Sequence, residues 1–123
     1  MPATERAVLA DRTRAILTVA YERRALVRVP AAVLASVCRG PRFDAAVNHL
    51  LHGHGIVVCE LSRPIAQQAG EILHRRKLSS QHAIDAFVVA TALTFESAVI
   101  ATSDPKDLRG MASPYRQIQM LSL

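Results

Sequence analysis

The stretch HAIDAFVVATALTFESAVIATSDPKDL, residues 82–108, contains two apolar segments that each carry an aspartate where an apolar residue is expected. Residues 82–96 are predicted to form a helix with little polar surface, and residues 97–102 an apolar strand. A short helix is expected at 104–112, because Asp104 suits an N-cap and Pro105 a first helical position. Helix, buried strand and helix in this order are typical of an α/β fold.

The rest of the chain shows the same alternation of helices and strands. We expect helices at 4–24, 30–39, 43–53 and 63–76, and strands at 25–29, 55–61 and 116–121. The strands are short, continuous and β-branched, which is the pattern of strands buried on both faces. The sequence therefore predicts one domain, residues 1–123, with a short parallel sheet in a three-layer α/β/α sandwich.

Composition and charge narrow the class of protein. Half of the residues are hydrophobic and 20% are charged, and no apolar run reaches the ~20 residues of a membrane span. Cys38 and Cys59 have no CxxC partner and are expected to be reduced core residues of a cytoplasmic protein. The net charge of +5 favours a polyanionic partner, although a compositional bias toward Arg is an alternative. Aromatic residues make up only 4%, which argues against a base-stacking platform.

Asp104 directly follows the strand SAVIAT, and ligands of open α/β sheets collect beyond the carboxyl ends of strands. The same residue is a good helix cap, with Asp107 at the third helical position to complement the helix dipole. A cap and a metal ligand are compatible roles, because a capping carboxylate keeps one oxygen free. The sequence leaves both open.

Asp85 heads an apolar helical stripe that continues through Val88, Val89 and Ala92. An acid in a first turn gains only ~0.5 kcal/mol from the helix dipole. If Asp85 and Asp104 lie about 5 Å apart, their repulsion is on the order of 3 kcal/mol at an effective dielectric constant of ~20. A divalent cation can offset this repulsion, and oxygen ligands favour Mg²⁺ or Mn²⁺ over zinc. His49, His52 and His54 form a rival cluster, but their spacing fits no familiar zinc pattern.

The segment IDAFVVATALTFESAVIATSDPKDL, residues 84–108, resembles the carboxyl-terminal half of a PIN domain, in particular of the bacterial VapC-type toxins. RVPAAVLASVCRG, residues 28–40, resembles the second strand and next helix of that family. GIVVCELSRPIAQQAGEIL, residues 55–73, resembles its third strand and the helix after it. The resemblance covers residues 26–111.

This resemblance implies a small α/β/α sandwich and a Mg²⁺- or Mn²⁺-dependent ribonuclease that forms a homodimer and is held inactive by a cognate antitoxin protein. The acids of the family's active site correspond to Asp85 and Asp104, which the resemblance implies are catalytic residues and metal ligands. Asp107 corresponds to an additional acid of the family. Thr102 and Ser103 match the small polar residues beside the site. The implied chemistry is metal-assisted hydrolysis of an RNA phosphodiester bond. Arg39 and Arg42, at and just after the end of the helix at 30–39 that carries Ser36, are expected to contact RNA phosphates.

The chain departs from this family pattern in two places. Ser36 stands where the family usually has a glutamate, and the chain lacks the family's first strand, which ends in an aspartate. AVLAD, residues 7–11, is an alternative for that strand, with Asp11 as its acid, but we favour a helix there. Because the first strand is central in this fold, its loss is expected to leave a gap between the strands LVRV and AVIAT.

Two other functions are weighed against a ribonuclease. A non-catalytic PIN remnant that binds an antitoxin or RNA is favoured by the small number of acids at the site. A nucleotide-binding or response-regulator-like module is disfavoured, because the chain has no glycine-rich phosphate loop.

Overall fold

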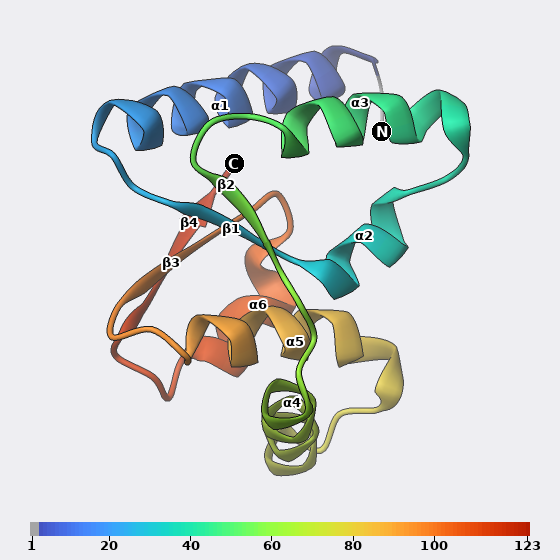
Figure 1. Cartoon of the computed structure of the whole chain (residues 1–123). Coiled ribbons are helices and arrows are strands. Elements are labelled where there is room, and N and C mark those ends of the chain that lie inside the picture. The colour runs from blue at the N-terminus through green and yellow to red at the C-terminus, as the bar shows by residue number, and fades with distance from the viewer. Residues whose placement is uncertain (1–2) are drawn as a thin grey trace.

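The computed structural model describes residues 3–123 and shows a mixed α/β fold in which helices alternate with short strands (Figure 1). The elements in chain order are α1 (Ala3–Glu22), β1 (Val27–Pro30), α2 (Ala31–Val37), α3 (Pro41–Leu51), β2 (Ile56–Cys59), α4 (Arg63–Arg76), the 3₁₀ turn η1 (Ser80–His82), α5 (Ala83–Ala92), β3 (Ala98–Thr102), α6 (Pro105–Ala112) and β4 (Ile118–Ser122).

The order of helices and strands predicted from the sequence is confirmed, with small shifts at the element ends. Local signals account for the boundaries: the Ser62 hydroxyl accepts a hydrogen bond from the Ile65 backbone N–H at 3.3 Å and caps α4. Gly40, with φ of +110°, separates α2 from α3, as glycine readily does. The alternative in which AVLAD forms a strand is wrong, because Asp11 lies within α1 and forms an exposed ion pair with Arg14 at 2.6 Å.

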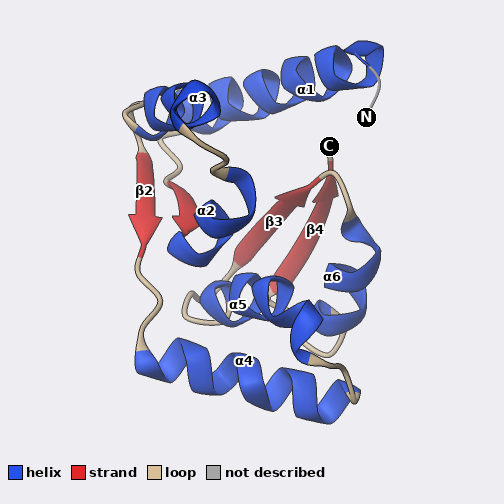
Figure 2. Cartoon of the chain, turned by 90° about the vertical axis from the view of Figure 1, so that its right-hand side faces the viewer, coloured by secondary structure: helices blue, strands red, loops and turns tan. Residues whose placement is uncertain are grey.

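The four strands are parallel in pairs but do not join into one sheet. β1 pairs with β2, with Val27 opposite Ile56, and β3 pairs with β4, with Ala98 opposite Ile118. Figure 2 shows the two pairs as separate ribbons. The parallel pairing agrees with the predicted fold class, whereas the single sheet does not form, since no strand in residues 3–123 lies between β1 and β3. A separation between the strands at 25–29 and 97–102 is what the resemblance led us to expect, and its cause stays a prediction.

One side-chain contact connects the two strand pairs across this gap. The guanidinium carbon of Arg28 in β1 lies 4.1 Å from the centre of the Phe95 ring, in the connection between α5 and β3. A cation over an aromatic face is attracted by about 0.5–1 kcal/mol at an exposed position. The contact supplies no backbone hydrogen bonds, and within residues 3–123 each strand pairs with one partner strand only.

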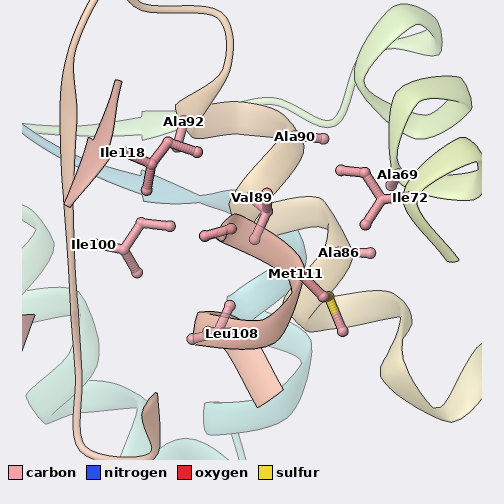
Figure 3. Packing of buried hydrophobic residues seen from close by; sticks show 11 residues of the cluster. Ala69, Ile72, Ala86, Val89, Ala90, Ala92, Ile100, Leu108, Met111 and Ile118 are labelled. Carbon is pink, nitrogen blue, oxygen red and sulfur yellow. The ribbon is translucent and has the colours of Figure 1, made fainter. Parts of the chain in front are cut away.

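The hydrophobic core lies between α4, α5, α6 and the β3–β4 pair (Figure 3). Ala86 and Ala90 of α5 point toward Ala69 and Ile72 of α4, and the three alanines let the two helices approach closely. The buried apolar residues are Ala69, Ile72, Ala86, Val89, Ala90, Ala92, Ile100, Leu108, Met111, Ala112 and Ile118. This packing holds the first turns of α5 and α6, which carry Asp85 and Asp107, on one rigid unit.

Cys38 and Cys59 carry free thiols, as predicted, but they are half-buried and lie outside the core. The expected core position is therefore wrong, because every buried position in the described residues lies at Ala69 or later. None of the helices within residues 3–123 is long and apolar enough to cross a bilayer.

Candidate metal centre

Three side chains from three successive elements converge at the start of α5 and α6. His82 ends η1 and precedes α5, Asp85 lies in the first turn of α5, and Asp107 lies in the first turn of α6. Each offers one ligand atom, and these atoms all lie within 4.8 Å of one another. Two carboxylates and one imidazole at this spacing form a donor set that a divalent cation can bridge.

The two carboxylates reach this position because both helices begin at the same side of the core. The packing of α6 on α5 involves Met111 and Leu108, which are buried, and it brings the two helix N-termini together. Partial positive charge at a helix N-terminus favours acids in the first turn. That effect stabilises Asp85 and Asp107 separately, but it does not remove their repulsion for each other.

The electrostatics of Asp85 show that its surroundings on balance disfavour the charged carboxylate. Burial raises the pKa of the half-buried Asp85 carboxyl above its usual value of 3.8, the Asp107 and Asp104 charges raise the pKa further, and His82 opposes them. Within residues 3–123 no donor forms a hydrogen bond with the Asp85 side chain. A half-buried carboxylate with no donor and two acidic neighbours is stabilised by a nearby cation.

His82 is the nearest basic group to these acids. Its Nδ1 atom lies 3.9 Å from an Asp107 carboxylate oxygen, with side-chain exposures of 22% for His82 and 52% for Asp107. Sequence reasoning missed this neighbour, although a signal for it is present, since His82 stands three residues before Asp85 and residues at this spacing share a helix face.

Asp104 lies at the N-cap of α6, but its exposed side chain makes no capping hydrogen bond. Its backbone N–H donates instead to the Thr102 hydroxyl at 3.1 Å. Asp104 is outside the three-residue group, although its charge raises the pKa of Asp85. The structure thus pairs Asp85 with Asp107, which the sequence suggested only as an additional acid. The assignment of Asp104 as a ligand stays a prediction.

The residues predicted to contact RNA lie on exposed or half-exposed backbone. Thr102 and Ser103 stand at the carboxyl end of β3, directly before Asp104. The Arg39 guanidinium donates to the carbonyls of Ala35 at 2.8 Å and of Cys38 at 2.7 Å. Arg42 is exposed in the first turn of α3. To bind RNA, the Arg39 guanidinium would have to break these two hydrogen bonds to backbone carbonyls.

The Ser36 hydroxyl donates to the Val33 carbonyl of its own helix at 2.7 Å, and Ser36 is exposed. The Ser36 hydroxyl is thus bound to the backbone of its own helix, and a serine contributes no negative charge to the metal centre.

The rival histidine cluster does not form a metal site among the residues described. The His52 ring nitrogen Nδ1 lies 2.6 Å from the Asn48 carbonyl oxygen, and the His54 ring stands edge-on to Tyr21, with ring centres 6.0 Å apart. The one metal-capable group in the described part of the chain is His82, Asp85 and Asp107.

Comparisons of the chain with protein-family models, with curated proteins and with solved structures each gave no match.

Proposed function

We propose that this protein is a metal-dependent ribonuclease of the PIN type, a VapC-like toxin that hydrolyses RNA phosphodiester bonds. The observation that carries the proposal is the group formed by His82, Asp85 and Asp107, whose ligand atoms lie within 4.8 Å of one another. The group lies where α5 and α6 begin, and β3 runs into α6 through Ser103 and Asp104. Strand ends followed by helix starts are where α/β folds bind ligands.

The residues fit a Mg²⁺ or Mn²⁺ ion that Asp85 and Asp107 hold, with Asp104 beside them. Such an ion, when bound, supplies an activated water and stabilises charge on the phosphate. Asp85 is the anchoring ligand, because its half-buried carboxylate lacks a hydrogen-bond donor and keeps its lone pairs for the ion. Asp107 is more exposed, with 52% of its side chain accessible, so a substrate phosphate can approach it.

The proposed substrate is RNA. The net charge of +5 supports a polyanion, and Arg39 and Arg42 supply cations at the end of α2 and the start of α3. Thr102 and Ser103 offer hydroxyls to phosphate oxygens next to the acids.

The proposal includes the partners implied by the family: a second copy of the chain and a cytoplasmic antitoxin protein. Large apolar side chains on the surface support a protein partner, because nine of the eleven exposed ones in the described residues lie before residue 62. We also propose that the complete fold is a three-layer α/β/α sandwich with one parallel sheet. A strand between β1 and β3 would join the two pairs into the single sheet of a three-layer α/β/α sandwich.

The test is cleavage of RNA by the 123-residue chain with Mg²⁺ or Mn²⁺, compared with Asp85→Asn and Asp107→Asn. We expect metal-dependent cleavage that falls at least about a hundredfold in both variants, a loss of ~2.7 kcal/mol of transition-state stabilisation. Glu96→Gln is the matched control, since Glu96 is exposed and outside the metal group. Cleavage that survives both aspartate changes, or needs no metal, would exclude this centre as the catalytic site.

A second function is favoured by one observation, the exposed Ser36 whose hydroxyl is used by its own helix. Without the usual glutamate the chain could keep RNA or antitoxin binding and lose hydrolysis. A folded protein that binds RNA in a filter-binding assay but cleaves none with either ion would support this non-catalytic alternative.

A further inference from the structure

His82 gives the centre a ligand chemistry that an all-acid site lacks. Its imidazole is three-quarters buried, with 22% of the side chain exposed, and Nδ1 faces the Asp107 carboxylate at 3.9 Å. Two atoms bound to one octahedral ion at about 2.1 Å lie roughly 3 Å apart in adjacent positions and about 4.2 Å apart in opposite positions. The 3.9 Å separation of Nδ1 from the carboxylate oxygen is closer to the value for opposite positions.

A nitrogen ligand separates one divalent cation from another. Mg²⁺ takes oxygen ligands and loses its water reluctantly, whereas imidazole suits first-row transition metals. For a mixed nitrogen and oxygen site, Mn²⁺ is the weakest of these metals, and the later ones bind more tightly. A centre with His82 as a ligand therefore binds Mn²⁺ in preference to Mg²⁺. A centre of two aspartates alone would distinguish the two ions far less.

The neighbouring Gln81 has the chemistry to orient this imidazole. Its side-chain amide nitrogen lies 3.3 Å from His82 Nε2, the ring nitrogen that does not face Asp107. Metal binding through Nδ1 requires the imidazole proton to be on Nε2. If the Gln81 side-chain amide is rotated by 180°, its oxygen replaces its nitrogen and accepts the hydrogen bond from Nε2–H. A partner on the second ring nitrogen fixes the tautomer and raises the basicity of the ligating nitrogen.

We propose that His82 binds the metal ion through Nδ1 and makes the centre selective for Mn²⁺ over Mg²⁺, with Gln81 as the residue that positions the ring. The inference rests on the metal centre of the proposed function, and it adds a ligand and a preference between two ions to it. It does not depend on whether the substrate is RNA.

The experiment measures metal binding to the full chain without RNA. Electron spin-echo envelope modulation of the Mn²⁺-loaded protein is expected to show a coupled ¹⁴N nucleus in the native chain and none in His82→Gln. By calorimetry we expect Mn²⁺ to bind at least about tenfold more tightly than Mg²⁺. His82→Gln should weaken Mn²⁺ binding at least about tenfold and change Mg²⁺ binding less than about threefold. Retained Mg²⁺ binding also shows that the variant is folded.

Two further variants test the positioning role of Gln81. Gln81→Leu should weaken Mn²⁺ about tenfold while Mg²⁺ binding holds, and Gln81→Glu should restore Mn²⁺ binding, because a carboxylate accepts the Nε2 proton. His49→Gln is the matched control, since His49 is an exposed histidine of α3 outside the metal group.

The outcomes separate this inference from the proposed function. Mn²⁺ binding with no ¹⁴N coupling in the native chain, or equal losses of Mn²⁺ and Mg²⁺ in His82→Gln, would overturn the role of His82 and leave a ribonuclease possible. A ¹⁴N coupling in a chain that cleaves no RNA would support His82 and remove the ribonuclease. Failure to bind either ion would overturn both.

Discussion

Residues 3–62 and residues 63–123 are alike in their elements and opposite in their packing. The first region holds α1, β1, α2, α3 and β2, and none of its described side chains is buried. The second holds α4 to β4, and all eleven buried apolar residues of the described chain lie in it. Figures 1 and 2 place α1 and α3 at one end of the molecule and α4 at the other.

This difference indicates that the two regions contribute differently to stability and function. Burial of apolar area is the dominant favourable term in folding, so residues 63–123 supply most of the free energy of unfolding. They also hold His82, Asp85 and Asp107, the group that can hold a metal ion, and metal binding needs fixed geometry. Residues 3–62 keep apolar side chains such as Val57 and Leu61 exposed.

The largest expected effect comes from one substitution made once in each region. Ile72→Ala in α4 should lower the free energy of unfolding by about 2–5 kcal/mol, because Ile72 is 2% exposed in the core. Ile16→Ala in α1 should cost less than about 1 kcal/mol. Ile16 is half-buried in a shallow apolar groove beside Leu121, and alanine favours the helix. Urea denaturation of both variants measures the two costs.

Equal costs for Ile72→Ala and Ile16→Ala would break the comparison. That result would mean that α1 packs as firmly as α4 in solution, through a partner copy or a rearranged groove, and the oligomeric state by light scattering would identify which.

Hydrogen exchange sharpens the same comparison without any mutation. Amides of α5 should exchange only on global unfolding, whereas amides of α1 and of the β1–β2 pair should exchange at least about a hundredfold faster through local opening. Mass spectrometry of peptic peptides after deuterium labelling resolves the two regions. Matching protection of α1 and α5 would contradict the assignment of stability to residues 63–123.

The pH dependence of stability tests the acids of the second region. Because the folded chain raises the pKa of Asp85, the folded state holds that proton more tightly than the unfolded state does. The resulting stability is present below the usual pKa of 3.8 and is lost as pH rises through the raised pKa. Metal-free Asp85→Asn should therefore melt higher than the native chain at pH 7, by up to about 4 °C, with no gain at the acid end.

Thermal melts from pH 4 to pH 7 with a chelator measure this difference, and Glu96→Gln is the control. Saturating Mn²⁺ should reverse the order, since an ion at a hundred times its Kd adds about 2.7 kcal/mol to a chain that binds it. A metal-free Asp85→Asn that melts below the native chain at pH 7 would show that Asp85 has a stabilising partner.

The smallest expected effect concerns the cations of the first region. The double change Arg39→Glu and Arg42→Glu should weaken RNA binding and lower the slope of log K against log salt by ~0.7 for each phosphate that the variant no longer neutralises. Arg12→Glu with Arg23→Glu carries the same change of net charge and should leave more of the salt slope. Equal effects of the two pairs would mean that charge acts at a distance and that α2 and α3 do not bind phosphate directly.

Local signals in the sequence determined the order of the elements. The Pro and Gly breaks, the capping serine before α4 and the β-branched runs each act within a few residues, so they predict elements such as β3 and α6 closely. The same locality placed Asp85, Asp104 and Asp107 at strand ends and helix starts.

Tertiary structure alone decided which of these residues meet. The packing of α6 on α5 selects Asp107 rather than Asp104 as the partner of Asp85 within 4.8 Å, and the turn η1 brings in His82. It also decided that the strands form two pairs and that Cys38 stays half-buried. Periodicity reports which face of an element is apolar, but distances between elements depend on long-range packing that no local pattern encodes.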